Sequence, residues 1–140
     1  MSNDKLTRWW RCAACVCAIS AALPAQANCD VAPGITRVEG RNAVVAFKTQ
    51  PGQIKVGELF ALDASLCAKN GGTLDATAFK VDASMPEHRH GMNYQPSVVK
   101  NGGAYRANGL MFHMPGRWQF AFDVDTAQGR ERILSDYRLD

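Results

Sequence analysis

The side chains best suited to chemistry in this sequence are three histidines and four methionines, and all of them lie in one stretch of the chain. That stretch holds every histidine and every methionine except Met1. An even spread would place about two of the seven in a window of this length. Imidazole and thioether groups suit copper, and thioether sulfur favours the cuprous ion, so the cluster predicts a site for Cu(I) or Cu(II). The candidate ligands are His88, His90, His113, Met92, Met111, Met85 and Met114.

The spacing within this stretch pairs the candidate ligands. His88 and His90 are separated by one residue, so on an extended chain both imidazoles project to one side and Arg89 projects to the other. Met111 and His113 have the same spacing. If folding brings the two pairs together, they offer two to four nitrogen and sulfur donors, which is enough for a copper site without cysteine.

The other methionines extend this ligand set. Met92 or Met85 can complete the metal shell. In a regular strand Met114 points away from His113, but a bulge at Gly109 would reverse the alternation. Met114 therefore stays a candidate ligand.

A structural interpretation competes with the metal site. A His-x-His pair in a loop is often held by hydrogen bonds, and Met111, Phe112 and Met114 can fill core space around Trp118, because methionine adapts to irregular gaps. On this interpretation the chain is a non-catalytic interaction or accessory module for a periplasmic redox or respiratory partner, and the cluster stabilises the fold.

We expect no enzymatic activity. A zinc enzyme built on the three histidines, with an open position for water, is the third interpretation. It would need a general base near the metal, and only Glu87 is close to the histidines in sequence.

The first 27 residues have the organisation of a secretory signal peptide. Basic residues precede an apolar run, residues 12–23, which is too short to span a bilayer core of about 30 Å. Ala25-Gln26-Ala27 then supplies the small residues that a signal peptidase requires. We predict cleavage after Ala27, export to the periplasm and a single mature domain over residues 28–140.

Leader removal changes the cysteine count. Cys12, Cys15 and Cys17 leave with the leader, so Cys29 and Cys67 remain. In an oxidising compartment they are expected to form one disulfide, which would stabilise the fold by about 3 to 4 kcal/mol on the chain-entropy model. Two alternatives stay open: a lipid anchor on Cys29, which Gln26 disfavours, and a thiolate ligand for the metal.

Charge argues against nucleic acid as a partner. Leader removal takes away three basic residues and one acidic residue, so the formal net charge falls from +3 to +1. No basic stripe remains to bind a phosphate backbone. The mature form also has no apolar run long enough for a membrane span.

Strand signals come in short pieces separated by turns. The turn signals are Pro51-Gly52, Asn70-Gly71-Gly72, the segment 100–103, Pro115-Gly116 and the segment 126–129. The predicted strands are residues 41–49, 57–64, 78–84, 105–114, 117–125 and 131–139.

Alternation of apolar residues defines the faces of these strands. It is clearest in residues 117–125, where Trp118, Phe120, Phe122 and Val124 share one face. Residues 57–64 alternate loosely, with Leu59, Ala61 and Asp63 on one face. No segment has a helical period. The pattern predicts an all-β protein, an immunoglobulin-like antiparallel β-sandwich of six to seven strands.

Two blocks, MPEHRHGMNYQP and GGAYRANGLMFHMPGRWQFAFDV, resemble the YtkA-like group of small exported domains, related in fold to CopC-like and FixH-like proteins. The resemblance covers residues 57–124. It implies an immunoglobulin-like β-sandwich in the periplasm, linked with copper handling or with maturation of redox or respiratory enzymes. The mature N-terminus lacks the histidine that some CopC-like proteins use, so a cupric site of that type is not implied. The blocks map onto Met85, His88, His90, Met92, His113 and Met114.

Overall fold

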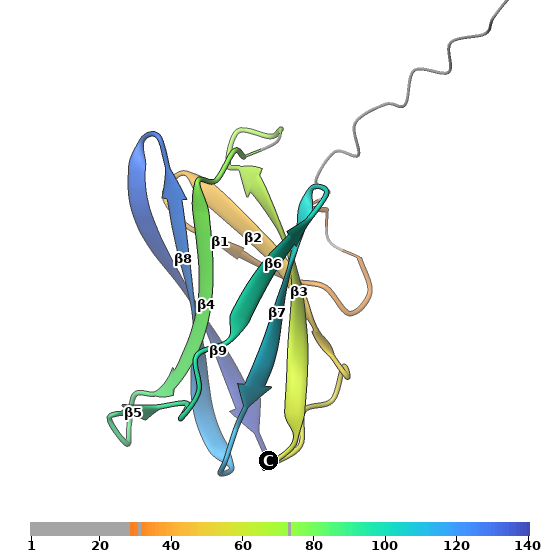
Figure 1. Ribbon diagram of the computed structural model, residues 1–140, viewed down its shortest axis with the longest axis vertical. Coiled ribbons are helices and arrows are strands. Elements are labelled where there is room, and N and C mark those ends of the chain that lie inside the picture. Colours follow the sequence, from red (N-terminus) through yellow and green to blue (C-terminus); the bar gives the residue numbers. More distant parts are fainter. Residues whose placement is uncertain (1–28, 31, 73) are drawn as a thin grey trace, which may run out of the picture.

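The computed structural model describes residues 29–30, 32–72 and 74–140 of the protein. This part of the chain contains no helix and forms nine strands in two antiparallel sheets, which pack face to face (Figure 1). The predicted all-β sandwich is therefore confirmed, with more strands than the six to seven expected. The predicted leader and its cleavage site lie outside the described residues.

A five-stranded and a four-stranded sheet make up the sandwich. The first has the order β1-β2-β3-β7-β6 and the second the order β5-β4-β8-β9. Without β1, these orders are the A-B-E-D and C′-C-F-G sheets of an immunoglobulin-like sandwich, with the strands in the same chain order. The strands of the first sheet are Thr36–Glu39 (β1), Ala43–Gln50 (β2), Leu59–Ala68 (β3), Ala104–Met111 (β7) and Ser97–Asn101 (β6). Those of the second are His90–Gly91 (β5), Ala78–Met85 (β4), Gly116–Thr126 (β8) and Gly129–Leu139 (β9).

The sequence pattern missed β1, β5 and β6. All three are short strands at sheet edges, and their residues are mostly exposed or half-buried. An edge strand with no buried face has no apolar alternation to mark it, so its pairing depends on its neighbour. Two of the predicted turns are correct: Gly102-Gly103 links β6 to β7, and Ala127-Gln128 links β8 to β9.

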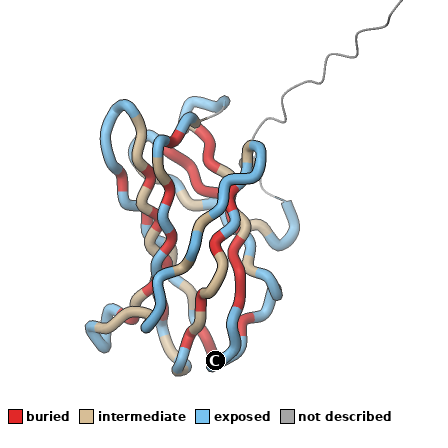
Figure 2. Tube along the Cα trace, viewed as in Figure 1, coloured by how far each residue is buried: buried red, intermediate tan, exposed pale blue. Residues whose placement is uncertain are grey.

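The core lies between the sheets, and β8 provides its centre. Trp118, Phe120, Phe122 and Val124 are all 0% exposed, as their alternation predicted. Phe112 stacks on Trp118 with 4.2 Å between the ring centroids. Figure 2 shows buried positions along the strands and exposed positions at the turns.

The face predicted for β3 was wrong. Phe60, Leu62, Ala64 and Leu66 point into the core, whereas Leu59 is 64% exposed. Burying a Phe or Leu side chain contributes about 1.5 to 3 kcal/mol, so the face with the larger side chains turns inward.

Gly109 does introduce a bulge. It has a φ of 84°, and the pairing of β3 with β7 shifts register opposite it. Before the bulge the odd-numbered residues Tyr105 and Ala107 are buried. After it the even-numbered residues Leu110 and Phe112 are buried. The strand ends at Met111, three residues earlier than predicted, because the chain then crosses to the other sheet.

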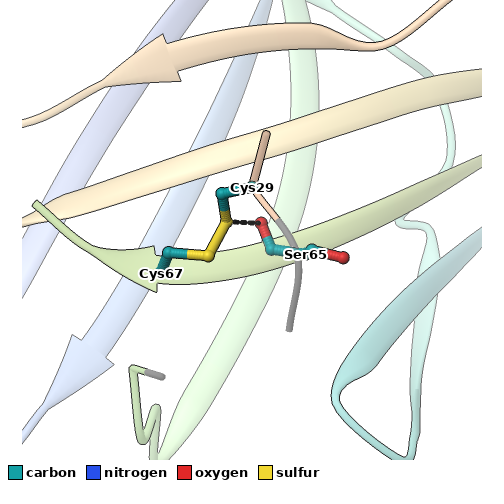
Figure 3. The surroundings of a disulfide bond; sticks show 3 residues. All are labelled: Cys29, Ser65 and Cys67. Atoms are coloured by element: carbon teal, nitrogen blue, oxygen red, sulfur yellow. Dashed lines mark hydrogen bonds between the residues drawn. A yellow bond between two sulfur atoms is a disulfide. The ribbon is translucent and has the colours of Figure 1, made fainter. Parts of the chain in front are cut away.

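A disulfide joins Cys29 to Cys67 in β3, with 6.1 Å between their Cα atoms (Figure 3). The sulfur of Cys29 lies 3.7 Å from the carbonyl oxygen of Ser65. This is a packing contact, because a disulfide sulfur carries no proton to donate. The pairing is the one expected from the sequence, and β3 extends far enough to include Cys67.

A buried carboxylate secures the same end of the sandwich. Glu131 of β9 is 8% exposed and accepts hydrogen bonds from the backbone N–H groups of Arg41, Asn42 and Ala43. Burial acts to raise the pKa of Glu131, but the three backbone donors outweigh it and the pKa is lowered. Gly40 leaves room for this carboxylate, since a Cβ there would collide with it.

No helix in the described part of the chain has the length and apolar character needed to cross a bilayer.

Candidate metal centre

The β4–β5 hairpin positions the first block of candidate ligands. Met85 pairs with His90 and Ser84 with Gly91, and the Met92 N–H donates to the Ala83 carbonyl at 3.1 Å. Residues opposite each other in an antiparallel pair point to the same face, so His90 and Met92 lie on the inner face with Met85. Met85 is 1% exposed.

The turn of this hairpin holds His88. The His88 N–H donates to the Met85 carbonyl at 3.1 Å, and Arg89 has a left-handed backbone with a φ of 55°. The His-x-His segment is therefore a turn, and not the extended strand expected from its spacing. The two imidazoles are still neighbours, with 5.7 Å between their ring centroids.

The β7–β8 connection brings in the second block. The His113 ring lies 5.0 Å from the His90 ring and meets the edge of Trp118 at 5.3 Å. Two hydrogen bonds fix this connection: the Gly57 N–H donates to the Phe112 carbonyl, and Trp118 Nε1 donates to the Met114 carbonyl at 3.0 Å. The two blocks predicted to converge do so, at the lower end of the sandwich in Figure 1, where β5 and the β7–β8 loop lie.

His90 carries an unsatisfied polar atom. Its Nδ1 is buried and has no hydrogen-bond partner in the described structure. Leaving a buried polar group unpaired costs about 1 to 3 kcal/mol, so proteins rarely do so without a reason. Neutral imidazole nitrogen is also the commonest metal-binding group in proteins.

The methionines near the histidines differ in burial. Met92 and Met114 are half-buried and pack against the core, and Met85 lies within it. The methyl carbon of Met85 would be 2.8 Å from a Cβ at position 116, where Gly116 has a φ of 129°. A side chain at that position would thus disturb both the backbone and Met85.

Met111 lies apart from the three imidazoles. It pairs with Leu59 and lines an open surface hollow with Tyr94 and Asn108, which contains none of the histidines. The chain turns toward the other sheet after Met111. Met111 and His113 are therefore in different surroundings, although they are only two residues apart in the sequence. Among the predicted ligands, Met111 is the one that the structure leaves outside the cluster.

The described residues provide no complete set of conventional metal ligands at this end. In the described segments, no three side chains among His, Cys, Asp and Glu are grouped closely enough to hold a metal ion. Cys29 and Cys67 are bonded to each other, which removes both as thiolate ligands. Glu87 is exposed, with Oε1 3.9 Å from Arg117 Nη1. Any metal bound here would depend on methionine sulfur to complete its shell.

A hollow on the outside of the second sheet borders the β4–β5 hairpin. It has a volume of about 380 Å³ and is lined by His90, Met85, Pro86 and Arg89, among others.

Comparison with known proteins assigns the family. The YtkA-like family profile matches residues 38–123, which is more than half of the chain. The chain belongs to the YtkA-like family. No curated protein and no solved structure matches the sequence. All seven candidate ligands lie within the matched span, so they are part of the YtkA-like domain itself.

Two features of this YtkA-like domain were not recognised from the sequence. Trp118 was predicted as core, but it also forms the aromatic wall against which the His90 and His113 rings rest, at 6.2 and 5.3 Å. The pairing of β5 with β4, which turns His90 inward, left no signal in a two-residue strand. The sequence signal that existed was the separation of only five residues between His113 and Trp118.

Proposed function

We propose that this YtkA-like domain is a periplasmic copper-binding protein that handles copper or delivers it to a redox enzyme. One observation carries the proposal: the His90 ring lies 5.0 Å from His113 and 5.7 Å from His88, and its Nδ1 is buried without a partner among the described residues. A metal ion would satisfy that nitrogen, and imidazole with thioether is a donor set that suits copper.

The compartment is part of the proposal. The predicted leader supports export, and the pairing of Cys29 with Cys67 suits an oxidising environment. A copper carrier must bind the ion with defined side chains and present it near the surface. A cluster at one end of a rigid sandwich meets both needs.

The test uses the correctly cleaved protein. Trp118 is the only tryptophan outside the predicted leader, so its fluorescence reports on the cluster alone. We expect copper to quench Trp118 and elemental analysis to show stoichiometric uptake. Both effects should be lost in the triple variant His88→Ala, His90→Ala, His113→Ala. Met111→Leu serves as the matched control, since Met111 lies outside the cluster, and it should bind as the wild type does.

The proposal is wrong if the cleaved protein binds neither Cu(I) nor Cu(II) above background. It is also wrong if the triple variant takes up copper as the wild type does.

A second candidate function is a non-catalytic accessory module for a periplasmic redox or respiratory partner. The observation in its favour is the packing of the histidines on Trp118, which is 0% exposed and stacks on Phe112. On this reading the rings serve the fold. The triple histidine variant would then lose stability to heat whether or not copper is present, whereas a copper protein gains stability from the ion in the wild type only.

A further inference from the structure

We infer that the cluster selects a monovalent soft ion, Cu(I) or its analogue Ag(I), over Cu(II), and that it holds the ion with His90, His113 and the thioethers of Met85 and Met92. This inference rests on the proposed function and makes it more specific. It leaves out His88, Met114 and Met111.

The first argument is the shortage of ligands for Cu(II). Cupric ions favour a tetragonal set of nitrogen and oxygen donors. No group of three His, Cys, Asp or Glu side chains in the described ranges is close enough to hold a metal. The acidic residue nearest the histidines in sequence, Glu87, has a side chain 63% exposed and faces Arg117. A cupric ion would have to draw most of its remaining ligands from water.

The second argument is the placement of sulfur around His90. Met85 lies directly opposite His90 across the β4–β5 pair, where Cβ atoms are about 4.5 to 5.5 Å apart. Met92 follows His90 by two residues on the same inner face, held by its hydrogen bond to the Ala83 carbonyl. Two thioethers therefore share the inner face with the imidazole whose Nδ1 is unpaired, and the His113 ring approaches it from the β7–β8 connection.

The third argument is electrostatic. His90, His113, Met85 and Met92 are neutral ligands, so they bring no negative charge to offset the ion. The surroundings include Trp118 at 0% and Met85 at 1% exposure, a setting of low polarity. The cost of desolvating an ion rises with the square of its charge, so a divalent ion pays roughly four times as much as a monovalent one. The hollow beside His90 is lined by two arginines, Arg89 and Arg132, against one acid, Asp82.

The experiment compares four ions on the cleaved protein. Ag(I), Cu(I) kept reduced without oxygen, Cu(II) and Zn(II) are each titrated while Trp118 fluorescence is followed and a competing chelator sets the affinity scale. We expect Ag(I) and Cu(I) to bind at least about tenfold more tightly than Cu(II) or Zn(II). The double variant Met85→Leu, Met92→Leu should lose at least about tenfold in Ag(I) affinity, while Met111→Leu should lose none.

A second measurement does not depend on any variant folding. In protein labelled with ¹³C at the methionine methyl groups, Ag(I) should shift the resonances of Met85 and Met92 and leave that of Met111 in place. Leucine has nearly the volume of methionine, so the double variant should also keep its thermal midpoint near that of the wild type.

The outcomes separate the two proposals. Tighter binding of Cu(II) than of Cu(I) and Ag(I) would overturn this inference and leave the copper function standing. Tight binding of Ag(I) with unshifted Met85 and Met92 methyl groups would overturn the assignment of sulfur ligands. Absence of binding by every copper species would remove the proposed function, and this inference with it.

Discussion

The two ends of the sandwich differ in whether their buried polar groups have partners. At one end the disulfide joins the N-terminal segment to β3, and the Glu131 carboxylate binds three backbone N–H groups of the β1–β2 turn. At the other end Arg89 has a left-handed backbone, and the Nδ1 of His90 is buried without a described partner. Cys67 and Leu59 lie on the same strand, about eight residues or roughly 26 Å apart.

The contrast indicates what each end is for. At the disulfide end every polar group named above has a partner inside the protein, so that end contributes stability. At the histidine end one buried nitrogen has no described partner and one non-glycine residue has a left-handed backbone, features that proteins retain where a ligand can compensate them. We therefore expect changes at the first end to affect stability and changes at the second to affect binding.

The largest expected effect is loss of the disulfide. Replacing Cys29 and Cys67 with serine should lower the free energy of unfolding by about 3 to 4 kcal/mol, because the unfolded chain regains the freedom of a long loop. Urea unfolding of the variant measures this change. Metal uptake by the folded variant should equal that of the wild type, and a variant that folds but no longer binds copper would break the separation between the two ends.

Removing the charge of Glu131 should come next. Glu131→Gln replaces a carboxylate that accepts three backbone hydrogen bonds, and hydrogen bonds to charged groups contribute about 1.5 to 3 kcal/mol, so we expect a loss of about 2 kcal/mol. Unfolding in urea at neutral pH measures it.

The same carboxylate predicts a dependence on pH. The folded-state pKa of Glu131 is lowered, so its contribution is fully present above the unfolded pKa of about 4.3. It is lost as the pH falls through the lower, folded-state pKa, because protonation removes the charge that the N–H groups bind. Wild type should therefore lose more stability than Glu131→Gln between neutral and strongly acidic pH. Parallel curves for the two proteins would contradict this account.

The sequence predicted the core and the disulfide better than the arrangement of the histidine cluster. The period of two in residues 117–125 placed four core residues correctly, because burial of large apolar side chains decides which face turns inward. The pairing of Cys29 with Cys67 followed from having two cysteines. Short strands such as β5 carry no such signal, and the left-handed Arg89 depends on hairpin geometry that forms only when β4 is in place.

The candidate site was predicted in composition but not in arrangement. Clustering selected residues of which the fold brings some together, since His90 does meet His113. Spacing alone also included Met111, because a regular strand was assumed where the bulge at Gly109 and the crossover to β8 redirect the chain. Whether a residue can act as a ligand depends on the face of the sheet that it occupies. That face is determined by pairing with a strand that is distant in the sequence.

A smaller effect is expected when His90 is replaced by phenylalanine. The change removes the unpaired Nδ1 while keeping an aromatic ring beside Trp118, so the metal-free protein should keep its stability or gain up to about 1 kcal/mol. Thermal unfolding with and without Ag(I) is the measurement, and the variant should lose the rise in midpoint that the ion gives the wild type. A clearly less stable metal-free variant would mean that His90 serves the fold, and the two ends would then differ less than proposed.

The smallest effect should come from the surface ion pairs, which occur at both ends. Arg130 forms two hydrogen bonds with Asp125, of 2.6 and 2.8 Å, near the disulfide end, and Arg117 Nη2 lies 2.9 Å from Asp136 near the histidine end. All four side chains are at least partly exposed, and such pairs contribute little because water screens them. Arg130→Ala and Arg117→Ala should thus unfold at nearly the wild-type urea midpoint, each to the same extent. A marked loss in only one of them would show that surface charge, and not the buried groups alone, distinguishes the ends.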